Sequence, residues 1–430
     1  MKEGRRVNSQ RLTAGGQRIK VGRMLTVVCC LLAVVCTAQN AQVNFTAKSY
    51  PFVHNERNEI VNDKVLDSFF SKLYMQRTQK NQRISVLQIG DSHIQADYIS
   101  AKIRTNFQND FGNAGRGLIV PIKVAGSNEP FNYRITSNVK CYGKRCVYVN
   151  DSLDYGIGGF AVKTSDDTAQ FRIRTFDYAP LNYAFNKMTL FYQQDSSYNF
   201  SLQDSLGNVL GSVKKDSTQL RNVSVIQLPT TTNEVYLKAH RNDSSESYSI
   251  LYGMNLENDS SGVLYHSIGV NGAEAYQYAH AKYFAEQTAV LKPEVIIISL
   301  GTNEAQRRPF DKALTEARLD SLVKQLQQYN PGKPIILTTP PDSYYRRKYY
   351  NSSISSYHVI VVDYAKANNL AVWDLFSATG GYKSCYQWKK YGLMQRDGVH
   401  FTRGGYELQG NLLYQAIIKS YNEYAEHRHP

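Results

Sequence analysis

The C-terminal part of the chain alternates short apolar segments with longer amphipathic ones, and this alternation constrains the fold more than any other feature. Apolar segments at 295–300, 334–340 and 370–375 alternate with helical patterns near 311–329, 356–368 and 404–422. An earlier strand pattern at 84–89 is followed by a helical stretch from about 95 to 109. Strands that alternate with helices form βαβ units around a parallel sheet, so the sequence predicts an α/β fold.

Residues 122–262 follow a different pattern, with short alternating runs separated by Asn, Asp, Ser and Gly turns. The clearest runs are at 170–176, 187–194, 224–229 and 234–240. Many short strands with polar turns are typical of an all-β sandwich. We therefore expect one α/β domain, made of residues 42–121 and 263–430, with a β-sandwich of residues 122–262 inserted after its first βα unit.

The N-terminus predicts export. Residues 1–24 hold seven Lys or Arg and one acidic residue, an apolar run follows at 25–36, and small residues come next. A basic segment, a short apolar segment and a small-residue site read as a secretory signal peptide, here 1–41, and the apolar run is too short to span a membrane. Cys36 leaves a lipid anchor open, but the bulky Val34 and Val35 before it disfavour that processing. We expect a periplasmic or secreted protein.

Part of the positive net charge of the chain belongs to the predicted signal peptide. Removing residues 1–41 takes away seven basic residues and one acidic residue, which lowers the net charge from +14 to +8. The remainder suits weak attraction to an anionic wall or glycan, and no basic stripe indicates a nucleic-acid partner.

The cysteines leave two readings open. Three of the six (29, 30 and 36) fall within the predicted signal, and Cys141, Cys146 and Cys385 remain. Cys141 and Cys146 flank a Tyr-Gly-Lys-Arg turn, which fits either a small disulfide in an oxidising compartment or two unpaired thiols. No second Cys/His pair lies at ligand spacing, so we expect no zinc site.

Polar residues gather where the predicted strands end. Ser92 follows the strand at 84–89, Asn303 follows the strand at 295–300, and Asp397 and His400 precede the last helix. A glycine turn at 270–273 holds Gly272. Because open parallel sheets bind ligands outside the carboxyl ends of their strands, we expect these residues at one edge of the sheet.

Each of these residue types has a use in acyl chemistry. Ser92 needs a base, and His400 is the natural candidate, with Asp397 three residues earlier to hold the imidazole in one tautomer. An oxyanion needs preorganised donors, which the N–H groups of Ser92 and Gly272 and the amide of Asn303 can supply. Each of these motifs alone is weak evidence for acyl chemistry, but together, in this order and at these strand ends, they are strong evidence for it.

Four motifs together resemble the SGNH (GDSL-type) hydrolase superfamily. They are Gly-Asp-Ser-His at 90–93, Val-Asn-Gly-Ala at 270–273, Gly-Thr-Asn-Glu at 301–304 and Asp-Gly-Val-His at 397–400. The resemblance implies a flavodoxin-like three-layer α/β/α fold and hydrolysis of acyl esters without a metal. His93 stands where the family commonly has Leu. Ser-His at this place, with a β-rich insert between the first two blocks, is similar to periplasmic peptidoglycan O-acetylesterases, whose carbohydrate-binding-like domain the insert resembles.

Several neighbouring residues have more than one reading. Asp91 is expected to cap the helix after Ser92 rather than to act in catalysis, and His93 to be structural or to face the substrate rather than to be the base. Glu304 can orient the strand-end turn or the substrate. The loops 113–118 and 340–350 are candidates for gripping a sugar or peptide, or are solvated loops.

We therefore expect an exported serine esterase that removes O-acetyl groups from a carbohydrate through an acyl-Ser92 intermediate, with peptidoglycan as the favoured polymer. It should need no metal and no cofactor, act on an acetylated glycan, and insert in no membrane after signal cleavage. A polysaccharide O-acetyltransferase and an acetylxylan-type esterase are enzyme alternatives. An inactive glycan-binding surface protein is the alternative of another class, which the complete set of Ser, Asp, His and Asn disfavours.

Overall fold

The computed structural model describes residues 41–148, 152–213 and 222–428. Residues 43–430 form one compact unit, and the following account concerns that unit. The predicted signal peptide, apart from its last residue, lies outside the described residues. Among the described residues, no helix has the length and apolarity needed to cross a membrane.

A six-stranded sheet forms the centre of the α/β region, in the order β1-β19-β16-β15-β2-β14. Its strands are β1 (Ile60–Val61), β2 (Arg83–Gly90), β14 (Gly262–Gly269), β15 (Val295–Ser299), β16 (Ile335–Thr338) and β19 (Ala371–Trp373). Five strands are parallel, and β1 pairs antiparallel with β19 at one edge. Taken in chain order, the parallel strands follow the doubly wound order 2-1-3-4-5. The predicted α/β fold is confirmed.

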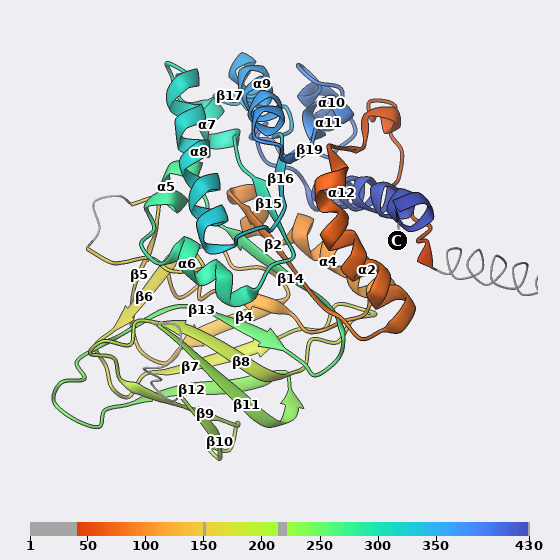
Figure 1. The fold of residues 1–430 in the computed structure, drawn as a ribbon. Helices are drawn as coiled ribbons and strands as arrows, with labels where there is room; N and C mark the ends of the chain where they lie inside the picture. Colours follow the sequence, from red (N-terminus) through yellow and green to blue (C-terminus); the bar gives the residue numbers. More distant parts are fainter. Residues whose placement is uncertain (1–40, 149–151, 214–221, 429–430) are drawn as a thin grey trace, which may run out of the picture. The chain divides into compact units, whose positions relative to one another are not determined.

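Helices lie on both faces of this sheet (Figure 1), with α2, α4 and α12 on one side and α5, α8 and α9 on the other. The longer helices are α2 (Asp67–Gln79), α4 (Tyr98–Phe111), α8 (Lys312–Tyr329), α9 (Ser352–Ala367) and α12 (Arg403–Glu423). The shorter ones are α3 (Ser92–Gln95), α5 (Ala275–His280), α6 (Phe284–Thr288), α7 (Thr302–Gln306), α10 (Leu375–Ala378) and α11 (Cys385–Lys390). The long helices lie where periodicity predicted them, and the short ones are too brief for that signal.

Local sequence explains where these elements begin. Asp311 starts α8 because its side chain accepts a hydrogen bond from the N–H of Leu314 at 3.0 Å. Thr402 does the same for α12 through the N–H of Gly405. The apolar face of α2 is buried through Phe69, Phe70 and Leu73. Side-chain caps and a one-sided apolar stripe are therefore enough to place these helices.

Two antiparallel sheets lie between α4 and β14 in the chain, one in the order β10-β9-β12-β7-β4 and one in the order β11-β8-β13-β6-β5. Their strands are β4 (Tyr133–Ser137), β5 (Tyr142–Arg145), β6 (Phe160–Thr164), β7 (Gln170–Thr175), β8 (Phe185–Tyr192), β9 (Asn199–Gln203), β10 (Val209–Ser212), β11 (Val223–Thr232), β12 (Glu234–His240) and β13 (Ser249–Glu257). The four sequence runs that alternated in polarity are all strands here.

The core runs continuously from the parallel sheet into the antiparallel region. Leu87 and Ile298 of the parallel sheet belong to the same buried cluster as Phe160 and Tyr252 of the antiparallel one. A further strand, β3 (Gly117–Ile119), precedes the predicted boundary at residue 122 and pairs with β13. The predicted domain limits stay predictions, and the shared core couples this region mechanically to the α/β region.

The cysteine question is settled by the structure. Cys141, Cys146 and Cys385 are all free thiols, so the disulfide that the sequence left open between the first two is absent. Cys146 is buried, and burial raises the pKa of its thiol to about 12. A thiol this far from ionisation reacts slowly, which suits a packing role.

Candidate active site

The candidate site lies at the point where the strand order of the sheet reverses. The neighbours β2 and β15 pair in parallel, with Gly90 opposite Ser299 at their carboxyl ends. The chain then leaves these two ends toward α3 and α7. Ligands bind at such a switch point because the diverging loops leave a crevice there. Ser92 and Asn303, predicted from separate motifs, enter that crevice from adjacent strands.

The turn after β2 can be made only by glycine. A Cβ on Gly90 would lie 2.3 Å from Cγ1 of Ile94 and 2.8 Å from the carbonyl oxygen of Ser299. Asp91 then caps α3, because its Oδ1 accepts a hydrogen bond from the N–H of His93 at 2.9 Å. This is the capping role that the sequence suggested. The cap makes Ser92 the first residue of the short helix α3, at the edge of the sheet.

The side chain of Ser92 and those of Asp397 and His400, about 300 positions later in the sequence, form one hydrogen-bonded chain. Oγ of Ser92 lies 3.0 Å from Nε2 of His400, and Nδ1 of His400 lies 2.7 Å from Oδ2 of Asp397. The other oxygen of Asp397 accepts the N–H groups of Val399 and His400, both at 2.9 Å. With Asp397 ionised, Nδ1 carries the proton, which leaves Nε2 free to accept the hydroxyl proton of Ser92.

Asp397 is held in its ionised form. Burial by itself raises its pKa, but the hydrogen bonds from the side chain of His400 and from two backbone N–H groups outweigh burial and leave the pKa below its ordinary value. An ionised carboxylate beside an imidazole stabilises the imidazolium that forms when a proton is taken up.

The structure brings Gly272 and Asn303 to the same edge. Gly272 has a φ of +85° and is exposed, with nothing near the position of a Cβ. Asn303 follows Gly301, whose φ of +126° and contact with Tyr357 leave no space for a side chain. Nδ2 of Asn303 donates to the carbonyl oxygen of Ala273 at 2.9 Å and to Oδ2 of Asp91 at 3.3 Å. The longer of these two bonds is the easier to exchange for a substrate oxygen.

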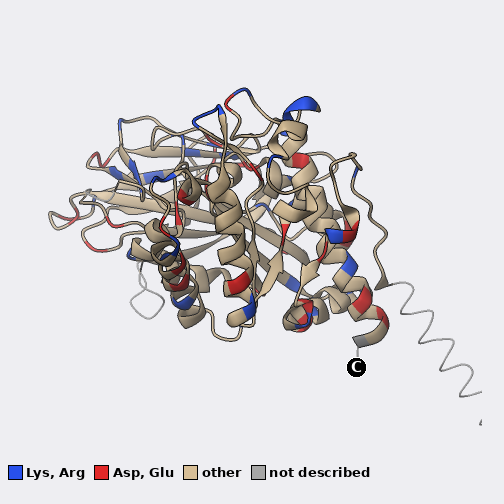
Figure 2. Ribbon diagram, turned by 90° about the horizontal axis from the view of Figure 1, so that it is seen from above, with Lys and Arg blue, Asp and Glu red and all other residues tan. Residues whose placement is uncertain are grey.

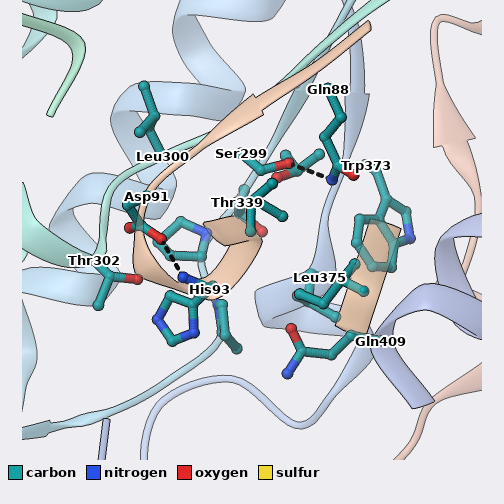
Figure 3. A pocket seen from close by; sticks show the side chains of 15 residues that line it. Gln88, Asp91, His93, Ser299, Leu300, Thr302, Thr339, Trp373, Leu375 and Gln409 are labelled. Atoms are coloured by element: carbon teal, nitrogen blue, oxygen red, sulfur yellow. Dashed lines mark hydrogen bonds between the residues drawn. The ribbon is translucent and has the colours of Figure 1, made fainter. Parts of the chain in front are cut away.

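Asp91 and His93 line a small cavity of about 30 Å³ (Figure 3), together with Trp373, Leu375 and Gln409. Burial raises the pKa of Asp91 to about 7. Burial lowers the pKa of His93 to about 3, and the nearby His400 adds to the effect. His93 is therefore neutral at physiological pH.

His93 supports the site rather than contacting Ser92. Its Nδ1 lies 3.1 Å from the hydroxyl of Tyr406, and its ring lies 5.4 Å from that of His400. The hydrogen-bonded partner of Ser92 is His400. The geometry thus gives His93 a packing position between His400 and α12.

Glu304 binds the start of α5. Its Oε1 accepts the N–H of Ala275, the first residue of α5 and two positions after the glycine turn, at 3.0 Å. The two readings left open by the sequence, orientation of the strand-end turn or of the substrate, stay predictions. Burial raises the pKa of Glu304 to about 8, and the neighbouring Glu274 adds to this. The side chain is therefore mostly protonated at neutral pH.

This raised pKa predicts a stability change that depends on pH. A carboxyl group whose folded pKa lies above its ordinary value stabilises the fold fully at low pH, and that contribution is lost as the pH rises toward the folded value. Glu304→Gln removes the titration. We expect the free energy of unfolding of the variant, relative to wild type, to rise between pH 4.5 and 8 by up to about 1.4 kcal/mol per pH unit.

Urea unfolding of both proteins at pH 5 and pH 8 measures this difference. Asp91 titrates in both proteins and cancels in the comparison. Glu316→Gln, at an exposed position on α8, is the matched control and should show no such trend. A Glu304→Gln difference that stays constant across this range would contradict the prediction.

The pocket in front of Ser92 has a volume of about 650 Å³. It is lined by residues from the strand-end loops and from the start of the antiparallel region, namely Ser92, Ala96, Tyr98, Asn128, Glu129, Phe131, Asn271, Gly272, Thr302, Asn303, Gln306, Gln395, Val399, His400 and Tyr406. The sequence-based prediction missed Asn128, Glu129 and Phe131, because their loop carries no signal beyond turn composition.

Gln95 fastens this loop to the glycine turn. Its Oε1 accepts the N–H of Asn271 at 2.7 Å, and its Nε2 donates to Oγ of Ser127 at 3.0 Å and to the carbonyl oxygen of Asn128 at 2.9 Å. Nδ2 of Asn271 also donates to Oδ1 of Asn128 at 2.7 Å. The buried side-chain amide of Gln95 therefore connects the loop at 127–128 to the turn at Asn271, on two sides of the pocket.

The loop at 113–118, which the sequence left as either a ligand-gripping or a solvated loop, does not line the pocket, and residues 114–118 are buried. Arg116 is fully buried and binds Oδ2 of Asp97 at 2.8 Å, while Arg104 binds both oxygens of the same carboxylate. Burial by itself raises the pKa of Asp97, but the two arginines hold it well below its ordinary value. Through the buried ion pair of Arg116 with Asp97, this loop connects the start of α4 to the segment before β3.

The chain matches the GDSL-like lipase/acylhydrolase family over residues 236–408, a region that contains Gly272, Asn303, Asp397 and His400 and begins after Ser92. A solved peptidoglycan O-acetylesterase shares the fold at 20% identity and a TM-score of 0.69, over 83% of this chain and 96% of that chain. No curated protein matches the sequence.

Two other solved structures match a smaller part of the fold. A GDSL-like lipase from Bacteroides thetaiotaomicron VPI-5482 has 21% identity and a TM-score of 0.29, over 36% of this chain and 76% of that chain. A catalytic mutant of Axe2, an acetylxylan esterase from Geobacillus stearothermophilus, has 22% identity and a TM-score of 0.30, over 37% and 74%.

The family match over residues 236–408 and the shared fold together support an SGNH hydrolase, and therefore a carboxylic ester hydrolase. Within that class, the chain resembles peptidoglycan O-acetylesterases.

Proposed function

We propose that this protein is an exported serine esterase that removes O-acetyl groups from a carbohydrate, with peptidoglycan as the favoured polymer. The observation that carries the proposal is the hydrogen-bonded chain from Ser92 through His400 to Asp397, which opens into a pocket large enough for a sugar residue. The fold shared with a peptidoglycan O-acetylesterase supports this choice of polymer.

The first half of the proposed reaction acylates the enzyme. Nε2 of His400 takes the proton of Ser92 as Oγ attacks the acetyl carbonyl carbon, and Asp397 stabilises the resulting imidazolium. When the tetrahedral intermediate collapses, the C–O bond to the sugar breaks and His400 returns the proton to the sugar oxygen. The products of this half are the free sugar hydroxyl and acetyl-Ser92.

The second half releases acetate. A water molecule enters where the sugar oxygen was, His400 removes one of its protons, and the hydroxide oxygen attacks the acetyl-Ser92 carbonyl. Collapse of this second intermediate returns the proton to Oγ of Ser92 and frees acetate. The negative charge on the carbonyl oxygen appears twice, and the N–H groups of Ser92 and Gly272 and the amide of Asn303 are the proposed donors to it.

The pocket offers polar and aromatic groups suited to a sugar. Oε2 of Glu129 is buried and has no hydrogen-bond partner among the described residues, although the side chain retains 10% of its accessible surface. Tyr98 and Phe131 stack on each other at 5.3 Å beside it. A free carboxylate oxygen accepts a hydroxyl or amide N–H, and aromatic faces pack on the apolar face of a sugar ring.

Acetate release from O-acetylated peptidoglycan and from acetylated xylan tests the proposal, with Ser92→Ala protein as the blank. We expect kcat/KM to be at least about tenfold higher for peptidoglycan, which corresponds to 1.4 kcal/mol of discrimination. A preference for xylan would make the protein an acetylxylan-type esterase. Transfer of acetyl to an added acceptor sugar, with little free acetate, would make it an O-acetyltransferase.

A further inference from the structure

A basic, tyrosine-rich surface borders the catalytic pocket and has no role in the reaction described above. It consists of the hairpin of β17 (Tyr344–Tyr345) and β18 (Tyr349–Tyr350) and of residues 382–391, which include α11. We call it the hairpin surface. Its six cations are exposed and have no carboxylate partner within the part of the chain that the structure describes; they are Arg346, Arg347, Lys348, Lys383, Lys389 and Lys390.

The two segments form one continuous surface. The rings of Tyr344 and Tyr350 stack at 5.4 Å, and Tyr350 lies 6.2 Å from Tyr382. The ammonium group of Lys383 lies 5.5 Å from the rings of both Tyr350 and Tyr382. Outside these pairs, Tyr349 and Tyr386 are exposed at 57% and 53%. Cations and aromatic faces therefore alternate over the whole patch.

The charge of this surface is of one sign. Figure 2 shows basic and acidic residues on most parts of the ribbon. By contrast, segments 343–350 and 379–396 contain no Asp or Glu. Asp342, just before the hairpin, is fully buried, and its Oδ2 accepts the N–H of Cys385 at 3.0 Å. The exposed charges of the surface are therefore the cations, and they create a local positive potential that attracts an anionic polymer.

The hairpin turn retains its arginines in a backbone conformation that disfavours them. Arg346 and Arg347 have φ values of +50° and +63°, in the left-handed region where Gly and Asn are the usual residues. Strained backbone of this kind is concentrated at functional sites. The strain is consistent with a functional use for two guanidinium groups at the tip.

The hairpin is attached directly to the catalytic loop. The N–H of Tyr344 donates to the carbonyl oxygen of Gly398 at 2.8 Å, and Gln306 donates from Nε2 to the carbonyl oxygen of Tyr344 at 3.0 Å. Gly398 lies between Asp397 and His400, and Gln306 lines the pocket. The hairpin surface thus begins at the rim of the site and is fixed to both of its sides.

We propose that the hairpin surface binds an anionic glycan strand while one acetylated sugar of that strand occupies the pocket at Ser92. This inference rests on the proposed function and extends it to a class of substrate, a glycan that carries carboxylates. The cations pair with the carboxylates, and the tyrosines pack on sugar rings. The exposed aromatic residues are Tyr, and Trp388 of α11 is fully buried. The surface thus exposes no Trp, Phe or Leu side chain of the kind by which surface-bound proteins enter a membrane, so a glycan is favoured over a lipid surface.

Two experiments test the surface. In the first, Arg346→Gln/Arg347→Gln/Lys348→Gln protein is compared with wild type on 4-nitrophenyl acetate, on acetylated xylan and on O-acetylated peptidoglycan. The matched control is Lys64→Gln/Lys72→Gln/Lys80→Gln, which removes the same charge from the region of α2. We expect the hairpin variant to raise KM for peptidoglycan about tenfold, since exposed ion pairs contribute little singly and three are lost together.

The small ester and neutral xylan should be hydrolysed equally by all three proteins. Added salt should raise KM for peptidoglycan in wild type and much less in the hairpin variant, because the attraction is screened. An unchanged KM for peptidoglycan in the hairpin variant, or an equal loss on xylan, would overturn the inference.

The second experiment measures binding without turnover. Ser92→Ala protein, with and without the hairpin substitutions, is sedimented with de-O-acetylated peptidoglycan and with vesicles of anionic phospholipid. Binding to peptidoglycan that the substitutions weaken supports the inference. Substitution-sensitive binding to vesicles alone would overturn it in favour of a membrane surface. If wild type released acetate from no glycan, the proposed function would fail, while this binding result would still decide the hairpin surface.

Discussion

Replacing Ser92 with alanine is expected to lower kcat on a small acetyl ester by on the order of 10³-fold or more, with the fold intact. The reason is geometric: Oγ is the group 3.0 Å from Nε2 of His400, and alanine leaves no atom to form the acetyl bond. His400→Ala should cause a loss of similar size, because members of a catalytic unit act together and their effects do not add.

Initial rates on 4-nitrophenyl acetate, together with thermal unfolding of each variant, measure this. Ser260→Ala and His240→Ala remove the same groups from exposed positions and should leave the rate unchanged. Hydrolysis by the Ser92→Ala protein at a rate comparable with wild type would disprove the proposed mechanism. A loss in the Ser92 variant alone would assign the base to a residue other than His400.

Asn303→Ala is expected to lower kcat by roughly 10²–10³-fold with little change in KM. The amide donates to a charge that exists only in the transition state, so its removal should leave ground-state binding nearly intact. In the structure, the amide already reaches Asp91 at 3.3 Å, and this is the bond that a developing oxyanion would replace.

Steady-state kinetics on the same ester separate the two parameters. Asn242→Ala, at an exposed position in the loop after β12, is the matched control and should behave as wild type. A change confined to KM would make Asn303 a substrate-binding residue and would leave Ser92 and Gly272 as the oxyanion donors.

The elements of the α/β region were predictable because their signals are local. Val295–Ser299 reads as a buried strand from its own residues, and α8 reads as a helix from its apolar spacing and from Asp311 at its start. Burial of a strand on both faces, and of one stripe of a helix, leaves a pattern within a dozen residues. The short helix α7 leaves no such pattern and was not predicted.

The hydrogen-bonded residues of the candidate site were predictable from the sequence, but several other residues that line its pocket were not. Ser92, Asn303, Asp397 and His400 stand out because polar groups follow apolar strands or form a compact motif. Glu129 does not stand out, because its place beside Ser92 depends on how the loop after residue 121 returns to the sheet edge. The place of the loop at 113–118, which the sequence left as a ligand-gripping or a solvated loop, was not predictable for the same reason, because Arg116 is buried against Asp97.

By itself, the sequence determined the alternation of strands and helices, the order of the polar motifs along the chain, and the acyl chemistry that their side chains can support. Only the tertiary structure decided that β2 pairs with β15, which brings Ser92 beside Asn303, and that Gln95 holds the loop at 127–128 to the turn at Asn271. It also decided that the hairpin at Tyr344 rests on Gly398. These contacts join residues tens to hundreds of positions apart, and closing such long loops depends on packing of the whole core rather than on any local pattern.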